Sequence, residues 1–371
     1  MDLTARLDRT VDDAIASNRI VGSVTLVARK GELVYARAAG HFDREAGLPM
    51  RRDAIFRLAS VTKPIVAATA LAMIERNLIG LNDPVADYLP YFKTRLADGR
   101  DARPSVRHLL THTSGLISDY AADPLINTGL PDTDFSFEEN FSRVARLPLS
   151  FEPGAAWQYG ISIDVLGAVV AAVHGATLGE AVQHYVTGPL GMTDTGFVVG
   201  DRSRLAVPYA DGAPGLRRMG DPETVLEPDG GTTSFSPARC FNPKAFQSGG
   251  AGMLGSADDL LKFFDTLRVG GGPILRPETV EMATMNQIGE LPREAKDAGQ
   301  RFGFLGAVLD DPAAANSPQA RGSFRWGGIY GHDWSVDPEN GFTIVSMTNT
   351  AVEGCIGLYP KQVRDAVYGR G

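Results

Sequence analysis

The chain has 371 residues, of which 43% are hydrophobic and 22% are charged, a balance typical of a soluble globular enzyme with a large core. Its formal net charge of −8, with no basic run longer than Arg217-Arg218, argues against a nucleic-acid partner. No apolar run approaches the length of a membrane span, so we expect no membrane partner. The sequence indicates no oligomeric state.

The N-terminus lacks the charged-then-apolar organisation of a signal peptide, and Leu3, Leu7 and Val11 fall at helical spacing. We therefore expect an amphipathic first helix and a cytoplasmic protein. In that compartment Cys240 and Cys355 are expected to be free thiols.

The expected elements begin and end with strands and are helical in the middle. They are a β-hairpin over 23–30 and 33–39, a helix from 60 to about 76, helices separated by Gly and Pro clusters over 105–200 with the clearest at 164–174, long irregular loops over 198–244, a helix over 257–268, strands at 303–309, 322–326, 333–336 and 343–348, and a last helix over 361–368.

This order predicts a discontinuous α/β domain over 1–60 and 245–371, whose sheet combines the N-terminal hairpin with the C-terminal strands. A mainly helical lobe with cleft-bordering loops would occupy 61–244. The Ser60 helix would pass along the junction, where ligand sites commonly lie.

Ser60-Val61-Thr62-Lys63 is an S-x-x-K motif at the head of a long apolar helix. Residues three apart on a helix share one face, so the Ser60 hydroxyl and the Lys63 amine can meet. The positive end of the helix favours negative charge at Ser60, and a buried lysine there can supply the base that a serine nucleophile needs.

Two further clusters add groups that such a nucleophile could use. The turn-forming stretch Glu152–Gly160 would deliver Tyr159 from a loop, and a tyrosine beside a lysine can serve as a proton shuttle. The stretch Arg325–His332 contains Trp326-Gly327-Gly328, and glycines in a strand mark close approach by a ligand or another chain. Such a strand can offer a backbone N–H to an oxyanion, with Trp326 walling the acyl or alcohol pocket.

Together the clusters resemble the serine β-lactamase and penicillin-binding-protein superfamily on its class C side, over nearly the whole chain. The secondary signatures that support the resemblance are Leu109–Leu116, Gly188–Met192 and Gly249–Ser256. The implied fold is α/β and β-lactamase/transpeptidase-like, with an antiparallel sheet flanked by helices and a mainly helical second lobe.

The chain also departs from that pattern. Tyr159-Gly160-Ile161 replaces the Tyr-x-Asn of β-lactamases and DD-peptidases, and Trp326-Gly327-Gly328 replaces their Lys-Thr-Gly or His-Thr-Gly. The chain thereby loses an amide that holds the side chain of a β-lactam and a cation for its carboxylate. Tyr without Asn and a W-G-G strand resemble the family VIII carboxylesterases, which hydrolyse short-chain esters.

The resemblance implies a mechanism without cofactor or metal. Ser60 attacks the ester carbonyl, Lys63 with Tyr159 takes its proton, and water hydrolyses the acyl-enzyme. Backbone N–H groups of Ser60 and Ile329 form the oxyanion hole, and Trp326, Gly327 and Gly328 contact the substrate, a small-molecule ester. The physiological ester is left open.

Several hypotheses compete with this interpretation. A β-lactamase or D-amino-acid peptidase/amidase would share the Ser60, Lys63 and Tyr159 groups, and a non-catalytic β-lactam or peptidoglycan sensor would not need all three. The nearest match to a G-x-S-x-G elbow contains Ser162, which we interpret as a helix N-terminal residue. His332-Asp333 could form a triad with Ser60, but the resemblance favours a structural role for His332. His108 and His112 are spaced as metal ligands, yet no acidic partner adjoins them.

Overall fold

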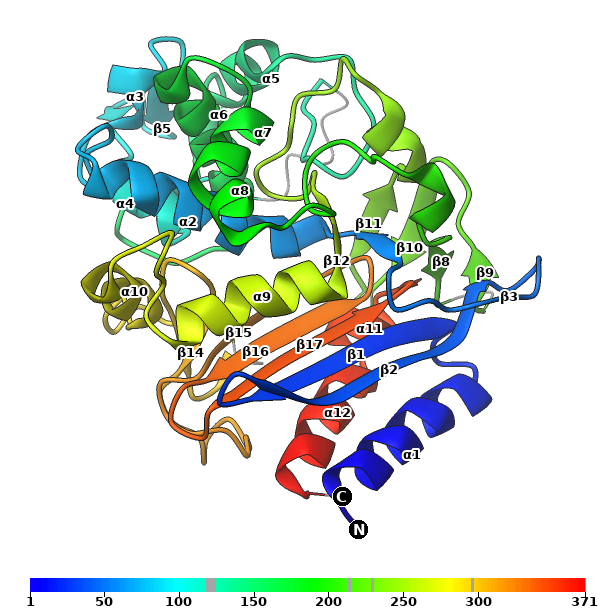
Figure 1. Cartoon of the computed structure of the whole chain (residues 1–371). Coiled ribbons are helices and arrows are strands. Elements are labelled where there is room, and N and C mark those ends of the chain that lie inside the picture. The colour runs from blue at the N-terminus through cyan, green and yellow to red at the C-terminus, as the bar shows by residue number, and fades with distance from the viewer. Residues whose placement is uncertain (118–124, 213–214, 228–229, 295–296, 371) are drawn as a thin grey trace.

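An eight-stranded antiparallel sheet unites the two ends of the chain in this computed structural model, which describes residues 1–117, 125–212, 215–227, 230–294 and 297–370 (Figure 1). In spatial order the strands are β13 (Gln300–Phe302), β14 (Ala307–Leu309), β15 (Phe324–Gly328), β16 (His332–Asp337), β17 (Phe342–Thr348), β1 (Gly22–Arg29), β2 (Glu32–Asp43) and β3 (Leu48–Pro49). Val24 of β1 lies opposite Met347 of β17, and Leu26 lies opposite Val345. The expected union of the N-terminal hairpin with the C-terminal strands is confirmed.

Helices cover both faces of this sheet. On one face lie α1 (Leu3–Ala16) and α12 (Leu358–Tyr368), which pack against each other, and on the other lies α9 (Ala257–Arg268) (Figure 1). Side chains alternate accordingly: Val24 and Leu26 join the large core, whereas Val27 packs in the smaller core beneath α1 and α12. Because the sheet is covered on both faces, β1 is buried over all its residues except Arg29.

The middle of the chain is mainly helical. Its helices are η1 (Ala59–Val61), α2 (Thr62–Glu75), α3 (Val85–Tyr88), α4 (Val106–Leu110), α5 (Phe137–Val144), α6 (Ser162–His174), α7 (Leu178–Val182), η3 (Gln183–Thr187) and α8 (Gly188–Leu190). Helix α2 contacts α6 and α7 and is buried along nearly its whole length, which is the position expected of a helix that is apolar on every side. Within the described residues no single helix is long and apolar enough to cross a membrane, and the one pair that passes together, α6 with Leu178–Leu190, is bent by 81°.

Small sheets and short helices complete the structure. They are β4 (Ile55–Arg57) with β12 (Leu254–Ser256), β5 (Thr94–Leu96) with β6 (Asp101–Ala102) and β7 (Pro148–Leu149), β8 (Tyr209–Ala210) with β9 (Arg217–Arg218) and β18 (Thr350–Ala351), β10 (Glu223–Leu226) with β11 (Thr232–Phe235), η4 (Arg202–Arg204), η5 (Pro237–Phe241), α10 (Pro277–Thr284) and α11 (Glu353–Ile356).

Two expectations about local structure are wrong. The region 198–244 contains short strands and helices, because β8 pairs with β18 and β10 pairs with β11. The single strand expected at 303–309 is a hairpin, since the chain turns at 303–306 and the Gly303 N–H donates to the Gly306 carbonyl at 2.8 Å. The proposed domain boundaries stay a prediction.

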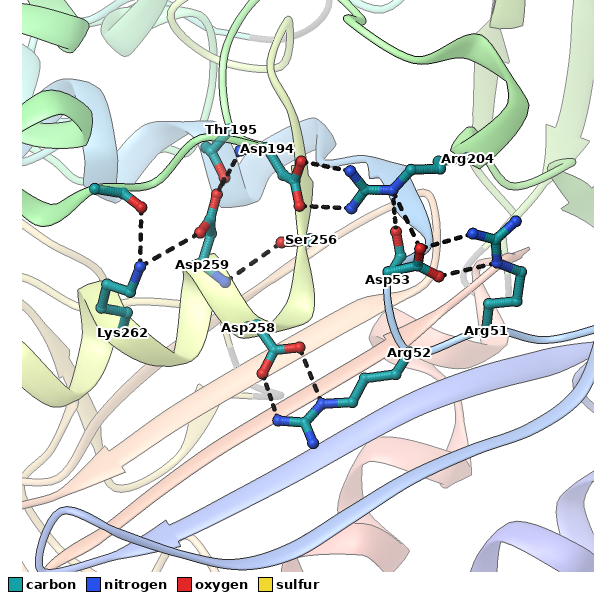
Figure 2. Close-up of polar contacts among 11 residues, drawn as sticks. Arg51, Arg52, Asp53, Asp194, Thr195, Arg204, Ser256, Asp258, Asp259 and Lys262 are labelled. Atoms are coloured by element: carbon teal, nitrogen blue, oxygen red, sulfur yellow. Dashed lines mark hydrogen bonds and ion pairs between the residues drawn. The ribbon is translucent and has the colours of Figure 1, made fainter.

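An ion-pair network holds the start of the 198–244 region against the strand that leads to Ser60 (Figure 2). The Arg204 guanidinium makes two hydrogen bonds to Asp194, at 2.8 and 2.6 Å, and a third to the Asp53 carbonyl at 2.9 Å. Nearby, Arg52 binds Asp258 of α9 at 2.6 Å. Each such surface pair contributes only about 0–1 kcal/mol, but together the pairs fix β4 relative to α9.

Candidate active site

The structure brings Ser60, Lys63 and Tyr159 together. Ser60 Oγ lies 2.9 Å from Lys63 Nζ and 2.9 Å from the Tyr159 hydroxyl, with both groups donating to it. Lys63 Nζ also lies 4.8 Å from the centre of the Tyr159 ring. One hydroxyl thus contacts both groups that the sequence predicted as its base.

Ser60 follows a residue with a strained backbone conformation. Ser60 lies in η1, directly before α2, and the preceding Ala59 has φ of +44°, in the left-handed region that non-glycine residues rarely adopt. Tertiary hydrogen bonds hold this turn: the Leu58 N–H donates to the Met253 carbonyl at 2.9 Å, and the Met253 N–H donates to the Thr62 hydroxyl at 3.1 Å. The strained conformation is therefore fixed by the segment that leads into strand β12.

A buried loop holds the Lys63 ammonium. Lys63 Nζ donates to the Gly250 carbonyl at 2.8 Å, and the Gly250 N–H donates to the Asp164 carboxylate at 3.1 Å, which also accepts from the Ser248 hydroxyl. Burial raises the pKa of Asp164 above its usual range, while the charge of Lys63 and both hydrogen bonds oppose that rise. Sequence reasoning missed these positioning residues, although the Gly-rich stretch at 249–255 contributed to the resemblance.

Aromatic side chains surround Tyr159. The indole N–H of Trp326 donates to the Tyr159 hydroxyl at 3.2 Å, and the rings lie 5.1 Å apart. The imidazole of His112 lies 4.7 Å from the Tyr159 ring. Burial, reinforced by the charges of Lys63 and Arg293, holds the pKa of His112 well below its usual range, so His112 is a neutral packing group. Trp326, which the sequence predicted as a pocket wall, thus also donates a hydrogen bond to the catalytic candidate Tyr159.

The predicted oxyanion strand, β15, ends against the turn that carries Ser60. A side chain at Gly328 would place its Cβ 2.3 Å from the Leu58 carbonyl oxygen, and one at Gly327 would lie 2.7 Å from another backbone carbonyl. These glycines therefore permit close approach by other backbone segments of the protein. The sequence had left open whether a ligand or another stretch of chain approaches them. Ile329 follows directly, so its backbone lies in the segment facing that of Ser60, and the two N–H groups stay the predicted oxyanion hole.

The competing triad is wrong. His332 Nε2 lies 2.8 Å from the Arg57 carbonyl, and burial lowers the pKa of His332 to about 4. Asp333 instead pairs with Arg325 at 2.8 Å and with Arg364 at 2.7 Å. His332 and Asp333 are thus structural, as the resemblance favoured.

Local structure also accounts for Ser162 and His108. Ser162 is the first residue of α6 and shares a 2.9 Å hydrogen bond with the buried Ser114 hydroxyl. His108 caps α4, where its Nδ1 accepts from the Ser105 N–H at 3.1 Å. Ser162 is thus a helix N-terminal residue, as interpreted from the sequence, and His108 is part of a helix cap.

A serine held by a lysine and a tyrosine, beside strand β15 of an antiparallel sheet and next to a helical region, defines the class of serine acyl-transfer enzymes related to penicillin-binding proteins. The Beta-lactamase family model matches residues 7–360, so the chain belongs to the Beta-lactamase family.

Individual relatives refine the comparison. The chain is 48% identical to Esterase EstB of Burkholderia gladioli over 377 aligned residues, which cover 99% of this chain and 96% of that protein. It is 29% identical to monacolin J acid methylbutanoyltransferase of Aspergillus terreus, over 88% of this chain and 86% of that one. Among solved structures, EstCE1, described as a hydrolase with promiscuous acyltransferase activity, superposes with a TM-score of 0.94 at 41% identity, over 99% of this chain and 98% of the other.

Proposed function

We propose that the chain is a serine carboxylesterase that hydrolyses short-chain esters through an acyl-enzyme on Ser60. The observation that carries the proposal is the placement of Ser60 Oγ at 2.9 Å from both Lys63 Nζ and the Tyr159 hydroxyl. Similarity to Esterase EstB and to the EstCE1 hydrolase supports ester chemistry.

In the acylation step, Ser60 Oγ attacks the ester carbonyl carbon. Its proton moves along one of its two contacts, to a neutral Lys63 amine or to a Tyr159 phenolate. The N–H groups of Ser60 and Ile329 bind the developing oxyanion, and each such donor contributes about 3–4 kcal/mol to transition-state stabilisation. The ester C–O bond then breaks, and the Tyr159 hydroxyl donates a proton to the leaving alkoxide. This is the proton taken from Ser60 or, on the Lys63 path, the tyrosine's own proton, which Lys63 then replaces.

In the deacylation step, water replaces the alcohol. The same base takes a proton from the water, whose oxygen attacks the acyl carbon, and the bond to Ser60 Oγ breaks with return of the proton to that oxygen. The products are a carboxylic acid and the free enzyme. The Gly250 carbonyl and the loop around Asp164 keep the Lys63 amine in place through both steps.

The second motif argues against a β-lactamase or amidase. Ile161 stands where those enzymes carry Asn, and its side chain is apolar and only 3% exposed. An apolar group cannot hydrogen-bond the acylamide of a β-lactam.

The test compares kcat/KM for 4-nitrophenyl butyrate and for nitrocefin in the wild type and in Ser60→Ala, Lys63→Ala and Tyr159→Phe. We expect ester turnover far above nitrocefin turnover, with loss of ester turnover in all three variants. Near-full ester activity in Ser60→Ala would overturn the assignment, and equal or faster nitrocefin turnover would favour a β-lactamase. A wild-type protein that binds these compounds without turning them over would favour the sensor hypothesis.

A further inference from the structure

A cavity of about 260 Å³ lies beside the catalytic cluster, between η5, the turn that follows it, and the β4–β12 pair. Ser60 itself does not line the cavity. However, Ala251 and Tyr330 line it. Ala251 directly follows Gly250, whose carbonyl holds Lys63, and Tyr330 directly follows Ile329, the predicted oxyanion donor. Arg57, three positions before the nucleophile, lines it as well. The cavity is therefore next to the reacting groups and large enough for a small organic group.

The charge of its wall is one-sided. Arg57, Arg202 and Arg239 line the cavity, and none of the described residues that line it is Asp or Glu. The arginines in Figure 2 differ in this respect, since Arg51, Arg52 and Arg204 each meet a carboxylate. An excess of positive charge in a cavity wall is a feature of anion sites, since arginine presents a planar fork of donors that matches a carboxylate.

Arg239 carries the strongest part of this argument. Its side chain is only 9% exposed, and its guanidinium donates to the Pro131 and Phe246 carbonyls, both at 2.7 Å, and to the Asn127 side chain. These acceptors are uncharged, and within the described residues no carboxylate forms an ion pair with Arg239, although Asp164 and Asp132 attract its charge from a longer distance. Burial lowers the pKa of Arg239 in spite of this attraction, so an anion bound directly to the guanidinium would offset part of the cost of burying the cation.

Arg57 repeats the pattern closer to the nucleophile. Its Nε donates to the Pro237 carbonyl at 2.8 Å and its Nη1 to the Ala206 carbonyl at 3.1 Å. Here too, both acceptors are uncharged, and the described part of the chain supplies no carboxylate partner.

Tyr330 adds a neutral donor. Its side chain is 6% exposed and packs edge-on against Phe235, with ring centres 4.8 Å apart. Its hydroxyl makes no hydrogen bond to any described residue. Burial raises the pKa of Tyr330 above its usual range, so the hydroxyl keeps its proton and can donate it to an anion.

We propose that this cavity binds a carboxylate carried by the ester substrate, so that the enzyme acts preferentially on esters with a free acid group several bonds from the scissile carbonyl. This inference rests on the proposed esterase activity. Arg57, Arg239 and the Tyr330 hydroxyl would hold the carboxylate, while Phe246 and Met253 line the apolar part of the cavity.

Matched ester pairs test which half of the substrate carries the acid. For the acyl half, kcat/KM is measured for mono-4-nitrophenyl glutarate and for uncharged 4-nitrophenyl pentanoate. For the alcohol half, 4-carboxyphenyl butyrate is compared with 4-carbamoylphenyl butyrate. A preference for the charged member in one pair assigns the carboxylate to that half, and no preference in either pair overturns the proposal.

Variants then tie the preference to the cavity. We expect the charged-to-uncharged ratio to fall about tenfold or more in Arg57→Gln and Arg239→Gln, and a few-fold in Tyr330→Phe, since hydrogen bonds from a charged donor are the stronger ones. Arg276→Gln is the control, because that side chain is 66% exposed and lies outside the cavity wall. Tyr330→Phe removes only an oxygen atom, so it keeps the test valid if an arginine variant fails to fold.

The two proposals fail in different ways. If Ser60→Ala retains hydrolysis of 4-nitrophenyl pentanoate, the esterase assignment fails. If that hydrolysis depends on Ser60 while the ratio is unchanged in Arg57→Gln and Tyr330→Phe, only the carboxylate site is wrong.

Discussion

The hydrogen bond from Trp326 to Tyr159 allows a test of whether Tyr159 or Lys63 takes the Ser60 proton. An indole N–H can only donate, so at 3.2 Å it stabilises negative charge on the Tyr159 oxygen. We predict that Trp326→Phe, which keeps an aromatic ring next to Tyr159, lowers kcat/KM for 4-nitrophenyl butyrate by weakening the stabilisation of a phenolate base.

The size of the effect separates the two possible bases. A hydrogen bond to a charged acceptor contributes about 1.5–3 kcal/mol, and one to a neutral acceptor about 0.5–1.5 kcal/mol. Since about 1.4 kcal/mol corresponds to tenfold in rate, loss of the bond to a phenolate predicts a decrease of roughly tenfold to hundredfold. Loss of a bond to a neutral tyrosine, with Lys63 as the base, predicts less than about tenfold.

Trp157→Phe is a matched control. Trp157 packs in the same aromatic cluster, with its ring 5.4 Å from that of Phe302, but its indole N–H has no hydrogen-bond partner within the described chain. The assay is the pH dependence of kcat/KM for both variants. We expect Trp326→Phe to lower the plateau and move the acidic limb to higher pH, with little change in Trp157→Phe. Equal effects of the two variants, or an unmoved limb, would refute the phenolate mechanism.

Three further predictions concern stability. His332 stays neutral in the folded state down to about pH 4, whereas an unfolded histidine is protonated below about pH 6.5. The free energy of unfolding should therefore fall by about 3 kcal/mol as the pH drops from about 6.5 to about 4. Urea titrations should find a shallower fall in His332→Gln but not in His184→Gln, where the histidine is exposed. Asp333→Asn leaves Arg325 and Arg364 without their charge partner and should lower the free energy of unfolding by about 3 kcal/mol, measured in urea at pH 7. A decrease below about 1 kcal/mol would contradict the stabilising role of this buried carboxylate. Gly328→Ala should lower stability by about 1–3 kcal/mol and reduce ester turnover, because its Cβ would meet the Leu58 carbonyl; unchanged activity would show that β15 does not need this approach.

The sequence predicted features that depend on local pattern. The pairing of β1 with β17 follows from apolar strands at both ends of the chain, and the contact between Ser60 and Lys63 follows from their spacing on one helical turn. Tyr159 lies far from Ser60 in the sequence, so the prediction that the two side chains meet depended on the family resemblance.

The features that the sequence did not predict depend on contacts between segments far apart in the chain, which leave no local pattern. The Gly250 carbonyl that holds Lys63 and the indole N–H that meets Tyr159 come from segments remote in the chain. At 303–309 an apolar run predicted one strand, but Gly306, with φ of +154°, allows the chain to reverse there. The short strands of the 198–244 region depend on partners elsewhere, such as β18, rather than on their own composition.

The most direct test of the central claim is to trap the acyl-enzyme. The protein is mixed with excess 4-nitrophenyl butyrate, quenched in acid during turnover, digested, and examined by mass spectrometry. We predict a butyryl group on the peptide that contains Ser60, absent in Ser60→Ala and more abundant if deacylation limits the rate. A butyryl group on another residue, or turnover in Ser60→Ala at the wild-type rate, would contradict the account.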